Sequence, residues 1–196
     1  MKIITILFFL MLNSQSIAQE SYQAEVKTFQ KKMNEKFKNP KKSPLPDKKI
    51  KGFDGLDYFP IDKNYRIVAQ FTRYEKPDIA QINTSTKRIA NYYKYAKLTF
   101  TIKGKNHKLD VYQSIENYKS KANKRLFLLF TDLTNGNGSY AGGRYIDLAI
   151  PEDEEIIIDF NKSYNPYCAY SYNYSCPIPP AENHLDIHIK AGVKKP

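Results

Sequence analysis

After its first 12 residues the sequence has no long apolar stretch, and it has no cysteine before Cys168. The first absence predicts that the mature chain is soluble, and the second argues against an N-terminal lipid anchor. The glycines are not followed by the lysine and hydroxyl residue of a P-loop, and no G-x-G-x-x-G pattern opens a helix. Nucleotide binding therefore has little support from the sequence.

Histidine is also scarce, with only His107, His184 and His188. The last two are four residues apart, which is a metal-binding spacing on a helix. The residues between them alternate as in a strand, where the same two histidines lie roughly 13 Å apart. We therefore predict no metal site and no cofactor. Nothing in the sequence places a histidine beside Cys168, as a nucleophilic cysteine would require.

The N-terminus has the pattern of a secretory signal. Lys2 supplies a positive charge, Ile3 to Leu12 form an apolar run too short to span a bilayer, and Ser16-Ile17-Ala18 offers small residues to a signal peptidase. We expect a signal peptide over residues 1–18, with cleavage after Ala18 or Gln19. The protein would then be a bacterial exported protein, periplasmic or extracellular.

Positive charge is concentrated near the start of the mature chain. Between Lys27 and Lys51 there are ten lysines against Glu35 and Asp47, whereas Gly52 to Pro196 carries 20 basic and 16 acidic residues. Such a lysine-rich arm is either a solvated tether or a weak contact for anionic surfaces. We expect no nucleic-acid partner, because an exported protein seldom meets one.

The mature chain divides into a helix, a linker and one β domain. Tyr22, Val26, Phe29, Met33 and Phe37 recur at spacings of three or four, which predicts an amphipathic helix over residues 20–39. Prolines predict that residues 40–51 form an extended linker. The remaining residues, 52–196, are enough for one domain with its own core.

Short runs of β-branched and aromatic residues fill this domain and predict antiparallel strands. We expect strands at Tyr65–Tyr74, Ile79–Thr84, Leu98–Lys103, Lys108–Ser114, Leu126–Phe130, Tyr145–Ile150, Ile156–Phe160 and Leu185–Lys190. The sequence Lys103-Gly104-Lys105-Asn106 indicates a hairpin between two of them. The fold class is mainly β, either a sandwich or a barrel, preceded by one helix.

One candidate binding segment is glycine-rich and runs from Asp132 to Tyr145. Its four glycines allow positive φ and a close approach of the backbone to a ligand. Asp132, Thr134, Tyr140 and Arg144 would present polar groups to a small polar molecule. The alternative is a structural turn in which Asp132 pairs with Arg144.

The second segment runs from Asp159 to Asn183 and has five tyrosines between Tyr164 and Tyr174. Flat rings with polar edges stack on sugars and other planar ligands, although they also pack loops onto a core. The polar candidates in this segment are Asn161, Asn165, Glu182 and Asn183.

The same segment holds both cysteines, Cys168 and Cys176. In an oxidising compartment they are expected to form a disulfide. Closing this nine-residue loop would stabilise the fold by roughly 2.5 kcal/mol.

Several of these segments resemble a bacterial and archaeal family known as domain of unknown function 1684. The resemblance rests on Ser43-Pro44-Leu45, Phe53 to Phe59, Asp132 to Tyr145, Asp159 to Asn183 and Ile189 to Gly192. It implies no activity. Family members typically continue their Ala-Gly pair with Glu, where this chain has Val193, so a role for that glutamate is absent here. Many relatives look cytoplasmic, which weakens the disulfide prediction, because reduced compartments leave such cysteines as thiols.

The leading hypothesis is a binding module whose two loops share one cleft for a small polar or carbohydrate-like ligand. One alternative is a hydrolase or thiol-dependent enzyme using Asp132, Glu182 or Cys168. Another is a scaffold for protein interactions. The sequence leaves open whether the protein is an enzyme, and it does not give the oligomeric state.

Overall fold

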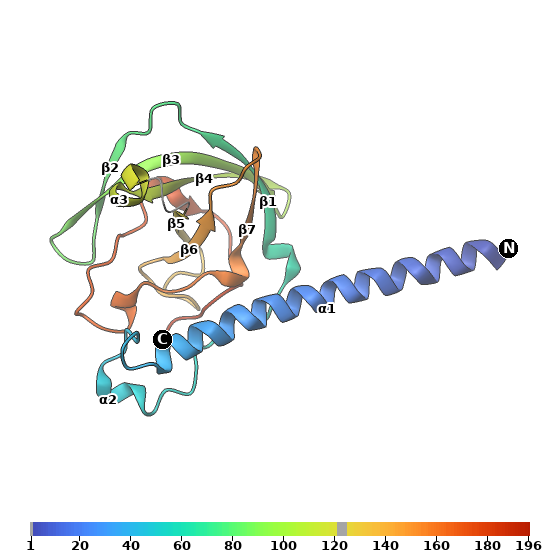
Figure 1. Cartoon of the computed structure of the whole chain (residues 1–196), viewed down its shortest axis with the longest axis horizontal. Coiled ribbons are helices and arrows are strands. Elements are labelled where there is room, and N and C mark those ends of the chain that lie inside the picture. The colour runs from blue at the N-terminus through green and yellow to red at the C-terminus, as the bar shows by residue number, and fades with distance from the viewer. Residues whose placement is uncertain (1, 121–124) are drawn as a thin grey trace.

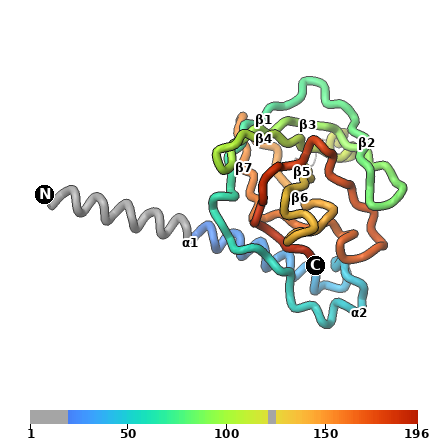
Figure 2. Tube along the Cα trace, turned by 180° about the vertical axis from the view of Figure 1, so that it is seen from behind, coloured from blue at the N-terminus to red at the C-terminus, as the bar shows by residue number. Residues whose placement is uncertain are grey.

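A computed structural model describes residues 2–120 and 125–196, with side chains from Glu20 onward (Figures 1 and 2). Strands are the main regular structure of the body, and short helices and long irregular segments join them. The helices are α1 (Lys2–Lys38), α2 (Asp47–Ile50) and α3 (Ile115–Ser120), with short 3₁₀ turns η1 (Lys63–Tyr65), η2 (Phe160–Lys162), η3 (Tyr167–Ala169) and η4 (Ala181–Asn183). The strands are β1 (Arg66–Arg73), β2 (Ile79–Asn83), β3 (Ile89–Ile102), β4 (Lys105–Ser114), β5 (Arg125–Asp132), β6 (Arg144–Ala149), β7 (Glu155–Asp159) and β8 (His184–Leu185).

The strands form one sheet that curls into a nearly closed barrel, which decides between the two expected architectures (Figure 1). The strand order is β6-β5-β4-β3-β1-β7, with all these neighbours antiparallel, while β2 pairs with β3 and β8 with β5. The two ends of this order, β6 and β7, come close together. Tyr145 of β6 and Tyr164, just beyond β7, exchange two backbone hydrogen bonds of 2.9 Å. This bridge narrows the remaining gap.

Alternation of side chains builds the barrel core. Leu98, Phe100 and Ile102 on β3 point inward, and Leu109 and Val111 on β4 meet them, all at most 4% exposed. Burying each such side chain contributes about 1.5–3 kcal/mol. The mainly β prediction is therefore confirmed, together with the helix that precedes the barrel.

The predicted hairpin joins β3 to β4. Lys103 and Gly104 both have positive φ, of 50° and 74°, as a tight two-residue turn requires. The strand before it is longer than predicted, since β3 begins at Ile89, and its register with β4 shifts between Lys94 and Ala96. Such a bulge bends a strand, which lets β3 pair with β2 at one end and β1 at the other.

The predicted strand Leu185–Lys190 is wrong in extent, because strand pairing stops at Leu185. The alternation that suggested it is real, since Leu185, Ile187 and Ile189 are buried while the residues between them are exposed. Figure 2 shows this C-terminal segment running across β5 and β6. Other groups bind its backbone, as described below.

Helix α1 docks over the region between β6 and β7. Tyr22, Val26 and Phe37 are at most 6% exposed, and Phe37 packs against Phe53 and Tyr170. The linker that follows is not wholly extended, because residues 47–50 form the single turn α2.

Candidate functional site

Asp132 and Arg144, both predicted to meet a ligand, form an ion pair inside the protein. Nη2 of Arg144 lies 2.7 Å from Oδ2 of Asp132, and both side chains are 0% exposed. Oδ1 of Asp132 accepts from the backbone N–H groups of Thr134 and Ile189 at 2.8 and 3.1 Å. Burial lowers the pKa of Arg144, and the neighbouring Asp132 opposes this shift. The carboxylate is thus fully used within the chain.

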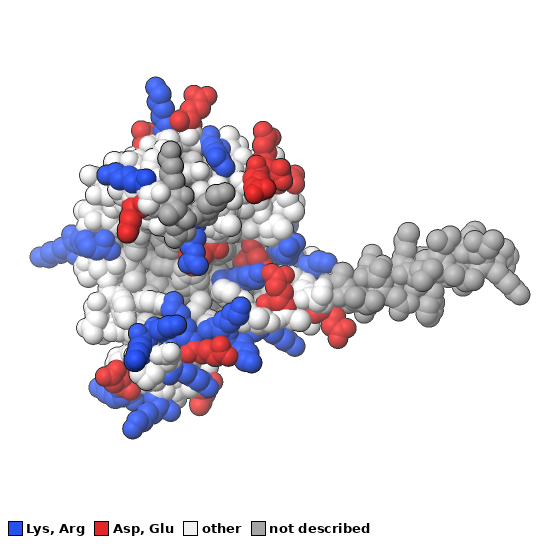
Figure 3. All heavy atoms as spheres, in the orientation of Figure 1, with Lys and Arg blue, Asp and Glu red and all other residues white. Residues whose placement is uncertain are grey.

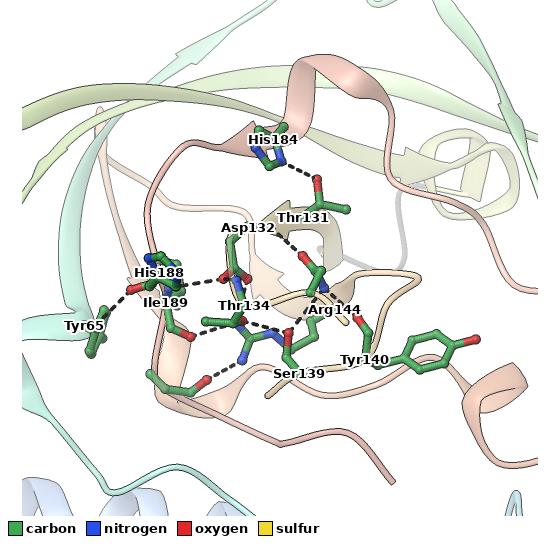
Figure 4. Close-up of polar contacts among 12 residues, drawn as sticks. Tyr65, Thr131, Asp132, Thr134, Ser139, Tyr140, Arg144, His184, His188 and Ile189 are labelled. Atoms are coloured by element: carbon green, nitrogen blue, oxygen red, sulfur yellow. Dashed lines mark hydrogen bonds and ion pairs between the residues drawn. The ribbon is translucent and has the colours of Figure 1, made fainter. Parts of the chain in front are cut away.

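The group that this pair binds is the backbone of the C-terminal segment (Figure 4). Arg144 donates to the carbonyls of Ile189, at 2.9 Å, and Ala191, and Tyr65 donates to the carbonyl of His188 at 3.2 Å. A buried backbone needs such partners. Between His188 and Ala191, side chains therefore replace the missing strand ladder, while the backbone of Leu133 binds the carbonyl of Ile187 at 3.0 Å.

Thr134 belongs to the same buried network. It is 1% exposed, and its hydroxyl lies 2.8 Å from the hydroxyl of Ser139. Gly143 closes the loop with φ of +87°, and a Cβ there would lie 2.6 Å from Pro179 Cγ and 2.7 Å from the Phe130 carbonyl oxygen. Glycine is needed at this position for the fold.

Asn183 and Asn161 also bind other parts of the chain. The Asn183 amide accepts from Asp110 N at 2.8 Å and donates to the carbonyls of Asp110 and Leu129 at 2.8 and 2.7 Å, so that it links β4 to β5. Asn161 donates to the Tyr22 hydroxyl at 2.8 Å and so holds α1 on the barrel. Both amides are at most 1% exposed.

Tyr140 and Glu182 lie apart from the buried network. The ring of Tyr140 points away from it (Figure 4), and the hydroxyl hydrogen-bonds the thiol of Cys168. Glu182 is exposed, with a carboxylate oxygen 4.0 Å from Lys94 Nζ. The two predicted loops do adjoin, because Tyr145 donates to the Pro177 carbonyl. Most of their polar candidates are nevertheless occupied by internal hydrogen bonds.

An open cavity of about 290 Å³ lies under the C-terminal part of α1, and of the candidate polar residues it includes Asn165. Aromatic rings from β5, β6 and the tyrosine segment form most of its wall, and α1 supplies Met33, Lys36 and Phe37. The rings are those of Phe37, Phe127, Tyr145, Tyr164, Tyr167 and Tyr170. Sequence reasoning missed the contributions of β5, β6 and α1, because only folding brings them to the tyrosines.

Asn165 lines this cavity, and two hydrogen bonds fix its amide. Its Nδ2 donates to the Tyr170 hydroxyl at 3.0 Å and to the Lys194 carbonyl at 2.9 Å. A carbonyl only accepts, so this contact fixes which end of the amide is nitrogen. Oδ1 is buried and has no hydrogen-bond partner among the described residues.

Three tyrosines of the cavity wall, Tyr145, Tyr164 and Tyr170, are neutral at physiological pH. Burial raises the pKa of Tyr170 to about 12 and raises those of Tyr145 and Tyr164 further. Asp147, which accepts a hydrogen bond from Tyr164, adds to the shift of that residue. These phenols are donors and apolar faces, not bases.

A second cavity, of about 390 Å³, shares Met33, Asp147 and Tyr164 with the first. The second cavity extends along α1, and more charged side chains line it than line the first. Its ionisable groups are Glu25, Arg66, Asp147, Asp159 and Lys162. Together the two cavities form a groove beneath α1 that is aromatic at one end and charged, with both signs, at the other.

The two cysteines are free, so the predicted disulfide is not formed in the structure. The backbone N–H of Cys168 donates to Cys176 Sγ at 3.2 Å. Cys176 is 9% exposed and lines the aromatic cavity, while Cys168 is half-buried.

The lysine-rich arm lies beside the groove. All ten lysines between Lys27 and Lys51 are exposed, and Figure 3 shows basic side chains gathered around α1 and α2. Lys36 reaches the groove, with Nζ 4.9 Å from the centre of the Tyr167 ring.

The model of the family described as "Protein of unknown function (DUF1684)" matches residues 51–194, which include nearly the whole barrel. The chain belongs to the DUF1684 family. The expected resemblance is thereby confirmed. The matched DUF1684 region includes the β5, β6 and tyrosine-segment walls of the groove, whereas the α1 wall precedes it.

The chain is similar to an uncharacterized protein from gene locus rrnAC0354 of Haloarcula marismortui, whose structure was solved by NMR in solution. The two share 34% identity with a TM-score of 0.70, over 90% of this chain and 96% of the other. A comparison with curated proteins finds no match. Within residues 2–120 and 125–196, no helix combines the length and apolarity that crossing a membrane requires. The described side chains include no cluster of three or more His, Cys, Asp or Glu residues arranged for a metal ion.

Proposed function

We propose that this protein is a binding module whose site is the groove beneath α1, and that its ligand is a small neutral molecule with hydroxyl groups and a flat apolar face, such as a sugar. The carrying observation is a cavity walled by aromatic rings, whose lining includes the polar residues Lys36, Asp147 and Asn165. Ligand sites typically combine such apolar walls with a few fixed polar groups.

Charge supports a neutral ligand. The aromatic cavity has one basic residue, Lys36, and one acidic residue, Asp147. Their charges cancel, so the cavity favours neither a strong anion nor a strong cation. Hydroxyl groups of a sugar would donate to the exposed carboxylate of Asp147, while ring faces such as that of Tyr167 would cover the apolar side of the sugar.

The size of the groove is adequate for one or two sugar rings. Ligand pockets commonly measure about 300–1,000 Å³, and the two adjoining cavities measure about 290 and 390 Å³. Oligosaccharides would extend from the aromatic end toward Asp159 and Lys162.

A binding screen tests the proposal. Neutral mono- and disaccharides, including N-acetylated hexosamines, are added to the purified chain, and binding is followed by ligand-observed NMR and by the melting temperature. We expect at least one sugar to bind, and Tyr167→Ala to weaken it about tenfold, equivalent to about 1.4 kcal/mol. Tyr172→Ala is the matched control, because Tyr172 belongs to the same segment and is 101% exposed.

A second variant, Asp147→Asn, keeps the shape of an exposed side chain and removes its charge. It should weaken sugar binding without lowering the melting temperature. Equal binding by Tyr167→Ala and Tyr172→Ala would reject the site. Failure of every sugar in the panel to bind at about 10 mM would reject the ligand class, since specific sites bind far more tightly than that.

We include export in the proposal, on the support of the signal sequence at residues 1–18. The helix residues that dock on the barrel, Tyr22, Val26 and Phe37, all follow the expected cleavage site, so cleavage would leave the groove whole. Mass spectrometry of the chain from its native host should find Gln19 or Glu20 at the N-terminus, in the periplasmic or extracellular fraction. A cytoplasmic chain that retains Met1 would refute export.

A further inference from the structure

Cys176 lines the groove and Cys168 adjoins it, but the two cysteines differ in their environments. Cys168 is half-buried, in η3, whereas Cys176 is 9% exposed. Cys176 is held on both sides by Ser85, whose N–H donates to its carbonyl at 2.8 Å and whose hydroxyl accepts from its N–H at 3.1 Å. An outside reagent therefore reaches Cys168 more easily, and Cys176 has a fixed position behind it.

Polar neighbours lower the pKa of the Cys168 thiol to about 6. The Cys176 thiol has the largest effect, and together with the hydroxyls of Ser85 and Tyr140 it outweighs burial, which alone would raise the pKa. The partner thiol shows the opposite shift, because its hydrogen bond to Cys168 and its burial raise the pKa of Cys176. A thiolate is the nucleophile in thiol–disulfide exchange.

We propose that Cys168 and Cys176 are a reversible redox pair, in which Cys168 reacts with an outside disulfide and Cys176 resolves the product. The inference does not depend on the ligand proposed above. The sequence predicted a permanent structural disulfide, whereas the proposed disulfide forms and breaks within the folded protein.

The reaction balances as a disulfide exchange. The Cys168 thiolate attacks one sulfur of a low-molecular-weight disulfide, whose S–S bond breaks and whose other sulfur leaves as a thiolate. Cys176 then loses its proton to solvent and attacks Cys168 Sγ, which forms the Cys168–Cys176 bond and releases the second thiolate. Two protein thiols are oxidised, and one outside disulfide is reduced to two thiols.

Oxidised glutathione is the probe. The reduced full-length chain is incubated with oxidised glutathione, and the reaction is quenched with N-ethylmaleimide. Mass spectrometry then gives the mass of the protein and the number of adducts. We expect the wild type to lose both alkylatable thiols without keeping a glutathione adduct. Cys176→Ser should keep one adduct on Cys168, because no thiol remains to displace it. Cys168→Ser should react at least about tenfold more slowly, since a buried thiol is poorly accessible.

Wild-type chain provides a test that needs no substitution. Acid quenching at early times, followed by peptide mapping, should find the first adduct on Cys168. Equal rates for the two serine variants, first adducts on Cys176, a wild type that stays reduced, or disulfides only between chains would each overturn the proposal. Circular dichroism of each variant distinguishes a lost reaction from a lost fold.

Discussion

The carboxylate of Asp132 lies 2.7 Å from the guanidinium of Arg144 in a site closed to solvent, and together they bind the backbone of Ile189. These two residues resemble a ligand site in sequence because they have the right groups next to flexible glycines. The structure shows that what they bind is the chain itself. Their function is to fix the C-terminal segment across β5 and β6.

Replacing Asp132 by asparagine should destabilise the protein severely. The change leaves the buried Arg144 charge without its partner, a loss that typically costs about 3–5 kcal/mol. Urea unfolding followed by circular dichroism measures it. Glu182→Gln is the control, because Glu182 is exposed and should change stability little. A loss below about 1 kcal/mol for Asp132→Asn would contradict a structural role.

Removing the Asn183 amide should separate two strands. Asn183→Ala leaves backbone groups of Asp110 and Leu129 unpaired inside the protein, and we expect a loss of about 1–3 kcal/mol. Amide hydrogen exchange should accelerate at Asp110, whose N–H loses its acceptor. Asn173→Ala is the exposed counterpart and should match the wild type in both measurements.

A charge on the buried face of α1 should release the helix. Val26 is 0% exposed, so Val26→Asp would bury an unpaired carboxylate, and undocking the helix is the less costly alternative. Trypsin should then cleave the lysine-rich residues 27–51 much faster than in the wild type. Ala24→Asp, on the exposed face, should leave the cleavage rate unchanged. If trypsin cleaved both variants at the same slow rate, the docking of α1 would not depend on Val26.

The alkylation rate of Cys168 should follow pH with one step near 6. The titratable groups that contact its sulfur are Tyr140 and Cys176, and the pKa of each is raised, Tyr140 chiefly by burial and Cys176 chiefly by its hydrogen bond to Cys168. Both stay protonated as Cys168 loses its proton, so the rate should rise from pH 5 to 7 and then level.

The rate of iodoacetamide consumption is measured against pH for the wild type and for Cys176→Ser. The variant lacks the thiol that lowers the pKa of Cys168 most, so its rate should rise at a higher pH than that of the wild type. A wild-type rate that still climbs above pH 8, as for an ordinary thiol, would contradict the shift.

Local patterns in the sequence predict much of the barrel. Period-two alternation locates most strands, and Lys103-Gly104 locates the hairpin, because both signals depend on neighbouring residues. The same signal fails after Leu185, where alternation is present but the backbone pairs with the side chains of Asp132 and Arg144. No local pattern distinguishes a ladder of strands from a set of side-chain contacts.

The groove illustrates the limit for site prediction. Its tyrosines are conspicuous in the sequence, but Phe127, Asp147 and Met33 come from three other elements and carry no local signal. The polar residues that did stand out were mostly those with internal roles. Asn165 is a candidate that does line the groove, but only folding brings it beside Phe127, Asp147 and Met33.

The attachment of α1 also sets an order of events during synthesis. Tyr22 leaves the ribosome early, yet the Asp159 carboxylate that it binds at 2.9 Å follows 137 residues later. Until that residue emerges, the helix has no surface on which to dock, and its apolar stripe is free for a chaperone. The groove is therefore among the last features of the molecule to exist.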